Sequence, residues 1–305
     1  MSSATRTSLP MIIPAAPFNL TDVVTCANLV EVAYNQYCQW EEQGKPSESD
    51  FTWTPKGVPT ELGSVWTGAP LWADSRAIVF MKPEPFGFLL QDSNGRAFLV
   101  LRGTESDADK YKDLEVGQVP YTLVSNPSFG NVHKGFFGIY SSMSSAIHAS
   151  VAALPAPATA FFFTGHSLGS SLITLAVPDV IYNAALPSGI TVMHYNFASP
   201  RTGDETFANA LNAIPGLPTY RIVNTEDLVP DVPFAVTRDL RHSYLYKHVG
   251  TTADFTAQYD SVGNNHSMMN SYLYAVNNPQ QPEGPIVQSS GCQPSLPLAL
   301  LATPA

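Results

Sequence analysis

Apolar and polar positions along the chain alternate in blocks that predict both helices and strands. The pattern predicts one helix near residues 20–42 and another from residue 135 to residue 153. Between them, apolar runs on both sides of Asn94-Gly95 predict a β-hairpin over residues 86–103, because Asn-Gly is a preferred hairpin turn. The first half of the chain therefore mixes both kinds of element.

The alternation continues through the second half. The apolar, aromatic run at residues 158–163 predicts an interior strand, and the leucines that follow it recur at helical spacing. Further expected elements are strands within residues 189–200 and 219–224 and a helix over residues 204–214. Strands that alternate with helices indicate an α/β fold with a mostly parallel central sheet flanked by helices. In such sheets the functional site lies at the carboxyl ends of the strands.

Length and composition indicate one folded domain. The chain has 305 residues, of which 44% are hydrophobic, enough to bury a large core. We expect this domain over residues 20–277, after an N-terminal extension of residues 1–19. Residues 278–305 are rich in proline and show little periodicity, so we expect a tail there.

The charge balance restricts the possible partners. Asp and Glu total 25 against 15 Lys and Arg, a formal net charge of −10. This balance disfavours nucleic acid and anionic membrane surfaces as electrostatic partners. No transmembrane segment is expected from the sequence. The first residues make a poor signal peptide because prolines interrupt their apolar patch. Compartment and oligomeric state stay open.

The junction after the aromatic run carries the clearest chemical signal. It reads Thr-Gly-His-Ser-Leu-Gly, with Gly165 and Gly169 on either side of Ser167. The Gly-X-Ser-X-Gly string alone also fits a simple tight turn. A strand before it and an amphipathic helix after it are the context of a nucleophile elbow, which exposes a serine hydroxyl at the top of an α/β sheet. Ser167 is therefore the predicted nucleophile.

A serine nucleophile needs a carboxylate and a histidine, which follow it in this order in α/β-hydrolases. The segment after the strand at residues 219–224 offers Glu226, Asp227 and Asp231. We favour Asp227, because it lies in the first turn after the strand. Glu226 and Asp231 remain alternatives.

Three of the seven histidines follow that carboxylate: His242, His248 and His266. His266 lies in a polar segment that runs into a helix, a placement that lets an imidazole reach over the serine. We favour His266 as the base, with His248 in reserve.

The reaction also needs donors for an oxyanion. The Leu168 N–H lies in the first turn of a helix and has no acceptor within that helix. A second donor is expected from a turn after an early strand, and Gly103-Thr104 follows the apolar strand that ends at Leu101. We expect Thr104 and Leu168 to form the oxyanion hole.

Seven segments together resemble one family, the fungal-type triacylglycerol lipases or class 3 lipases, which are related to the feruloyl esterases. In chain order they are FLVLRGTES, VHKGFFGIY, FTGHSLGSSL, NFASPRTGDETFA, YRIVNTEDLVPDVP, YKHVG and NNHSMMNSYL. The resemblance covers roughly residues 20 to 276. It implies an α/β-hydrolase fold in a single domain with a lid segment. It also implies Ser167, Asp227 and His266 as the triad, and Thr104 with Leu168 as the oxyanion hole.

The resemblance carries three further expectations. The lid would be residues 105–116, a strongly polar segment here, which argues against long-chain fat as the substrate. The family often ties its first helix to the C-terminus, which would pair Cys38 with Cys292; the alternative is three reduced thiols. Pro178 departs from the family's uninterrupted helix and should kink or end it.

The chemistry points to a carboxylic ester hydrolase of lipase type, acting through an acyl-serine on an acyl ester in solution or at a lipid–water interface. A short-chain or feruloyl-type esterase is the close alternative. A non-catalytic binding module on the same fold is the alternative from another class. No cofactor or metal is expected, since neither His-Glu-X-X-His nor paired Cys-X-X-Cys patterns occur. The family resemblance would imply secretion, but localisation stays unknown.

Overall fold

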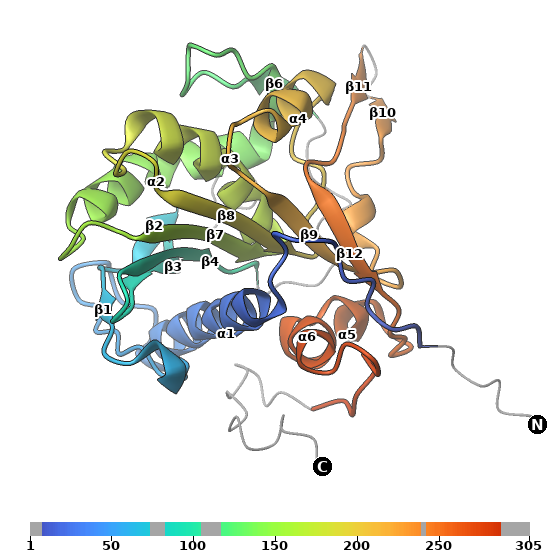
Figure 1. The fold of residues 1–305 in the computed structure, drawn as a ribbon, viewed down its shortest axis with the longest axis horizontal. Helices are drawn as coiled ribbons and strands as arrows, with labels where there is room; N and C mark the ends of the chain where they lie inside the picture. Colours follow the sequence, from blue (N-terminus) through green and yellow to red (C-terminus); the bar gives the residue numbers. More distant parts are fainter. Residues whose placement is uncertain (1–7, 74–82, 105–116, 239–241, 288–305) are drawn as a thin grey trace, which may run out of the picture.

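One eight-stranded sheet forms the centre of the protein (Figure 1). The computed structural model describes residues 8–73, 83–104, 117–238 and 242–287. The strands lie in the order β1 (Trp66–Thr67), β3 (Glu84–Gln91), β4 (Arg96–Leu101), β7 (Ala160–His166), β8 (Thr191–Phe197), β9 (Thr219–Asn224) and β12 (Thr251–Phe255), with β2 (Leu71–Ala73) also paired to β3. Neighbouring strands from β4 to β12 are parallel, and β3 is antiparallel to β1, β2 and β4.

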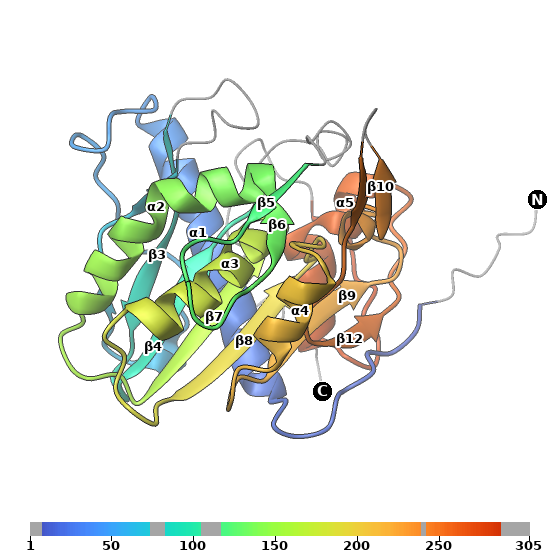
Figure 2. The same cartoon turned by 90° about the horizontal axis from the view of Figure 1, so that it is seen from above.

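Helices cover both faces of this sheet (Figures 1 and 2). On one face lie α1 (Leu20–Glu42), α5 (Val262–His266), the π-helix η5 (Met268–Leu273) and α6 (Tyr274–Asn277). On the other lie α2 (Lys134–Ala152), α3 (Leu168–Asn183) and α4 (Glu205–Asn212). The mostly parallel, helix-flanked sheet is the architecture that the sequence predicts.

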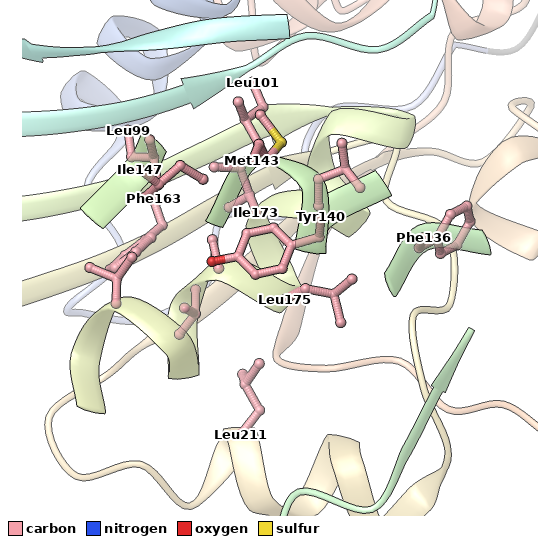
Figure 3. Packing of buried hydrophobic residues seen from close by; sticks show 14 of the residues in the cluster. Leu99, Leu101, Phe136, Tyr140, Met143, Ile147, Phe163, Ile173, Leu175 and Leu211 are labelled. Carbon is pink, nitrogen blue, oxygen red and sulfur yellow. The ribbon is translucent and has the colours of Figure 1, made fainter. Parts of the chain in front are cut away.

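Two hydrophobic cores lie on the two faces of the sheet, and β4 contributes to both. Leu99 and Leu101 belong to the core beneath α2 and α3, part of which Figure 3 shows. Phe98 and Val100 belong to the core beneath α1. Successive side chains of a strand point to opposite faces, so a strand covered on both sides is apolar at every position. This explains the uninterrupted run Phe-Leu-Val-Leu.

Smaller elements complete the described fold. Two antiparallel ladders stand outside the sheet: β5 (Gln118–Pro120) with β6 (Asn131–His133), and β10 (Val236–Arg238) with β11 (Ser243–Leu245). Two short 3-10 helices are η1 (Thr60–Leu62) and η4 (Val229–Asp231).

Several predicted elements are confirmed, and α1 and β9 have the predicted bounds. The helix at residues 20–42 is α1, which Asn19 caps by accepting from the Thr21 N–H at 2.9 Å. The hairpin is formed by β3 and β4, and the strand at residues 219–224 is β9. Asp204, expected inside a helix, is instead the N-cap of α4. Strand β12 was not predicted, because its short and largely polar sequence lacks the apolar pattern of the other strands.

Helix α3 runs through Pro178 and ends only at Asn183. Of the two outcomes predicted at Pro178, a kink or an end, the end is wrong, because the helix continues past it. Proline removes one backbone hydrogen bond from a helix interior. The helix continues because Pro178 and the turn after it, up to Val180, are buried, and this packing offsets the lost bond.

Two expectations fall partly or wholly outside the described residues. The predicted lid at residues 105–116 lies outside them. Cys38 is disulfide-bonded, whereas Cys26 is a buried free thiol. The expected partner of Cys38, Cys292, lies outside the described residues.

The N-terminal part of the described chain contacts the domain. Leu9 forms an isolated antiparallel bridge with Thr256, and Met11 is buried. The division into an extension, a domain and a tail remains a prediction. Within the described residues, none of the helices combines the length and the apolar character needed to cross a bilayer.

Two fully buried histidines make stability depend on pH. Burial lowers the pKa of His133 to about 4 and that of His194 to about 3. The folded protein thus keeps both imidazoles neutral in mild acid, while the unfolded chain protonates them below a pKa of about 6.5. Their contribution to stability is complete above that pH and is lost as the pH falls, by about 1.4 kcal/mol per pH unit for each histidine.

We therefore expect His194→Gln to flatten the pH dependence of the free energy of unfolding. Between pH 6 and pH 5 its slope should be smaller than that of the unmodified protein by about 1.4 kcal/mol per pH unit, one proton's worth. Urea unfolding at a series of pH values measures this slope. His242→Gln, at an exposed histidine, is the control and should leave it unchanged. Equal slopes for both variants would contradict the assignment.

Candidate active site

Ser167 stands at a sharp junction between β7 and α3. Its φ of 57° and ψ of −126° are unusual for a residue with a side chain. The turn is tight enough that a Cβ on Gly165 would lie 2.6 Å from the Gly169 oxygen. A Cβ on Gly169 would lie 2.2 Å from the Arg102 oxygen. Both glycines are therefore required by close backbone approaches.

Three predicted residues meet at this junction. The Ser167 Oγ lies 2.7 Å from His266 Nε2, and His266 Nδ1 lies 2.8 Å from Asp227 Oδ2. A carboxylate only accepts, so Nδ1 carries the proton and Nε2 accepts from the serine hydroxyl. Asp227 follows β9. The sequence predicted a polar segment without helix at His266. In the structure His266 is instead the last residue of the short helix α5.

Asp227 is almost fully buried and accepts two further hydrogen bonds. The Val229 N–H donates to Oδ1 at 2.9 Å, and the Tyr272 hydroxyl donates to Oδ2 at 2.7 Å. Burial and the nearby Asp227 raise the pKa of Tyr272 well above its usual value, so this phenol stays a donor. Sequence reasoning missed this role, because Tyr272 fits an apolar helix position equally well.

The alternatives lie elsewhere. The Asp231 side chain is 66% exposed and pairs with Arg201 at 3.2 Å. Glu226 accepts from Gln258 Nε2 at 2.6 Å. Burial and two neighbouring arginines lower the pKa of His248 to about 3.

Hydrogen bonds of Asn224 and Asn265 connect the segment that carries Asp227 to the segment that carries His266. The Asn224 amide donates to the Ala257 oxygen at 2.8 Å and accepts from the Ala257 N–H at 3.0 Å. Asn265, one residue before the base, donates to the Glu226 oxygen at 3.0 Å. Since Glu226 precedes Asp227, this bond links the residue before the base to the residue before the carboxylate.

The segments that carry the two predicted oxyanion donors both lie close to Ser167. Leu168 is the first residue of α3, where helix N–H groups point away from the helix body. Thr104 follows Gly103, and a Cβ on Gly103 would lie 2.8 Å from the Ser167 Cβ. The turn that carries Thr104 therefore passes directly beside the serine.

Arg102, just before this turn, is fully buried, and its guanidinium contacts several groups. It lies 3.0 Å from Glu84 Oε1 and donates to the Gly103 oxygen at 2.6 Å. Its guanidinium also lies between two aromatic rings, 4.0 Å from the Tyr37 centroid and 4.5 Å from the Phe86 centroid. A buried charge needs such compensation, and sequence reasoning had no signal for it.

No group of three or more His, Cys, Asp or Glu side chains suited to a metal ion occurs in the described part of the chain.

Comparison with known proteins identifies related sequences. The family described as lipase (class 3) matches residues 98–237. A phospholipase A1-II 3 of Oryza sativa subsp. indica is 28% identical over 211 residues, covering 61% of this chain and 49% of that protein. A lipase of Rhizomucor miehei is 33% identical over 144 residues, covering 47% of this chain and 39% of that protein. The chain thus spans about half the length, or less, of these curated relatives.

Solved structures show the same fold. The Lip2 lipase of Yarrowia lipolytica matches 81% of this chain and 82% of its own, with a TM-score of 0.56 and 21% identity. The triacylglyceride lipase of Rhizomucor miehei matches 80% and 82%, with a TM-score of 0.54 and 22% identity. The chain has the α/β-hydrolase fold, as predicted.

The Arg102–Glu84 pair leads to a stability prediction. We expect Glu84→Gln to lower the free energy of unfolding by about 3 kcal/mol, because it leaves a buried guanidinium without its counter-charge. Urea unfolding measures the change. Glu205→Gln is the matched control, since Glu205 pairs with Lys247 at 2.7 Å on the exposed surface, where such a pair contributes little. Similar losses for both variants would contradict the role of burial.

Proposed function

We propose that this chain, which is similar to the class 3 lipases over residues 98–237 and to a lipase of Rhizomucor miehei, is a carboxylic ester hydrolase of lipase type. One observation carries the proposal: Ser167, His266 and Asp227 form a continuous hydrogen-bonded series, with links of 2.7 and 2.8 Å. In this arrangement a weak nucleophile is activated by a neutral imidazole whose tautomer is fixed.

The reaction would proceed through an acyl-serine. The Ser167 Oγ attacks the ester carbonyl while His266 Nε2 takes its proton. The carbonyl oxygen becomes an oxyanion, which the Thr104 and Leu168 N–H groups stabilise. When the tetrahedral intermediate collapses, the C–O bond to the alcohol breaks and Nε2 returns its proton to the leaving oxygen. Water, deprotonated by His266, then attacks the acyl-serine by the same steps and releases the acid.

Asp227 would hold His266 in position and stabilise the imidazolium that forms twice in each cycle. Its two further hydrogen bonds, from Val229 and Tyr272, fix the carboxylate itself. No cofactor enters these steps.

The substrate is proposed as an acylglycerol or a related acyl ester. The relatives are named lipase and phospholipase A1, and both names refer to ester bonds of glycerolipids. A short-chain or feruloyl-type esterase uses the same machinery and remains the alternative. A binding module without turnover is the less favoured alternative, because it would give the hydrogen-bonded serine and histidine no role.

Triad variants test the chemistry. We expect Ser167→Ala to reduce kcat for ester hydrolysis by up to about a millionfold, and Asp227→Asn by about ten-thousandfold. Both should remain folded, since neither change removes an apolar core contact. Asp231→Asn is the control and should retain activity. Hydrolysis of a soluble p-nitrophenyl ester measures all three. Substantial activity in Ser167→Ala, or a loss confined to Asp231→Asn, would overturn the assignment.

The polar sequence at residues 105–116 yields a substrate prediction. A lipase with a lid becomes more active at an oil surface when that surface covers the apolar area that the open lid exposes. This covering stabilises the open state by roughly 25 cal/mol per Å². This segment contains Asp107, Asp109, Lys110, Lys112, Asp113 and Glu115, so little such area is available. We expect appreciable activity on soluble short- or medium-chain esters and at most a modest rise above the solubility limit. A chain-length series of p-nitrophenyl esters checks this, and a steep rise confined to long-chain triglyceride emulsions would refute it.

A further inference from the structure

A second series of hydrogen bonds lies behind the catalytic one. The Gly103 N–H donates to the Tyr34 hydroxyl oxygen at 3.0 Å. That hydroxyl lies 2.7 Å from His166 Nδ1, and His166 Nε2 lies 3.0 Å from the carbonyl oxygen of His266. Tyr34 comes from α1 and His166 from the elbow, and both are buried. The series thus joins four segments that are far apart in sequence.

The proton positions in this series follow from its last member. A carbonyl oxygen only accepts, so His166 Nε2 carries a proton and donates to His266. The neutral ring then accepts at Nδ1, and the Tyr34 O–H donates to it. Burial and the nearby His266 lower the pKa of His166 well below its usual value, which agrees with a neutral ring. Every donor in the series therefore has one acceptor.

The two ends of this series are parts of the catalytic machinery. One end is the backbone of His266, the proposed base. The other is Gly103, whose carbonyl shares a peptide plane with the Thr104 N–H and points the opposite way. Tyr34 binds the N–H of Gly103 and Arg102 binds its carbonyl. With both groups held, the direction of the Thr104 N–H is set before substrate arrives.

We propose that Tyr34 is a positioning residue for ester hydrolysis, which fixes the oxyanion turn relative to the base through His166. This inference rests on the proposed function. A donor acts on an oxyanion only within about 2.7–3.1 Å, and removing one donor costs 10²–10³ in kcat. A less rigid turn should therefore lower kcat by part of that factor. KM should change little, because the oxyanion forms only after binding.

The test compares two buried tyrosines. Tyr34→Phe removes the central hydroxyl of the series and keeps the ring. Tyr195→Phe is the matched control: Tyr195 is buried in the core beneath α1, and its hydroxyl accepts from the Asn19 N–H at 3.2 Å, at the start of α1. Both variants lose one hydroxyl beneath the same helix, but only Tyr34 contacts the turn beside Ser167.

Steady-state hydrolysis of soluble p-nitrophenyl butyrate by the full chain provides the first measurement. We expect Tyr34→Phe to lower kcat about 10- to 100-fold with KM within about twofold, and Tyr195→Phe to change neither. The inhibition constant of a boronic acid, whose serine adduct mimics the tetrahedral intermediate, should rise with Tyr34→Phe by a similar factor. Equal kinetics for the two variants, or a change in melting temperature alone, would overturn the proposal.

A second variant decides the question if Tyr34→Phe does not fold. In His166→Gln the amide N–H can take the place of Nε2 and donate to the His266 oxygen, but no acceptor then stands in the place of Nδ1. The Tyr34 hydroxyl loses this bond, so the variant should also lower kcat at unchanged KM. Where both single variants fold, their double variant should be no slower than the slower single, because they interrupt one series. If the fold-losses in kcat of the two single variants multiplied in the double variant, this account would be wrong.

An unmodified protein inactive on esters would refute the proposed function. An active protein whose kinetics these variants leave unchanged would refute only the role of Tyr34.

Discussion

The close backbone crossing at Ser167 is the constraint on which the rest of the site depends. A Cβ at Gly169 would lie 2.2 Å from the Arg102 oxygen, so the first turn of α3 is in direct contact with the end of β4. This contact places the oxyanion turn beside the serine and aims the first N–H groups of α3 at the same point. Substituting either elbow glycine would separate these elements, and the nucleophile and its oxyanion donors would no longer face one another.

Around this crossing, the polar groups of the site are buried and paired rather than solvated. Asp227, His166 and Arg102 are each at most 3% exposed, and each bonds to partners on other elements. Buried polar groups are costly when unpaired. Such a network therefore selects one arrangement of the segments that carry it, and the geometry needed for catalysis is supplied by folding.

The sequence predicted those features that depend on local pattern. The elbow glycines, helix α1, the hairpin turn and strand β9 follow from residue types a few positions apart. Asp227 was chosen over Asp231 because it lies in the first turn after the strand, and the structure brings it to His266. Contacts between distant segments could not be read in this way: Tyr272 on Asp227 spans 45 residues and Tyr34 on His166 spans 132. The continuation of α3 past Pro178 likewise depends on tertiary packing that propensity does not include.

The central claim is that Ser167, activated by His266, is the group that attacks the ester carbonyl. Reaction with diethyl p-nitrophenyl phosphate tests it directly, because this reagent phosphorylates an activated serine much faster than ordinary hydroxyl groups and reports each event by releasing nitrophenolate. Peptide mass mapping should find one diethylphosphoryl group per chain, on the peptide that contains Ser167, in proportion to the activity lost. Complete loss of activity with the label on another residue, or full labelling with activity retained, would contradict the claim.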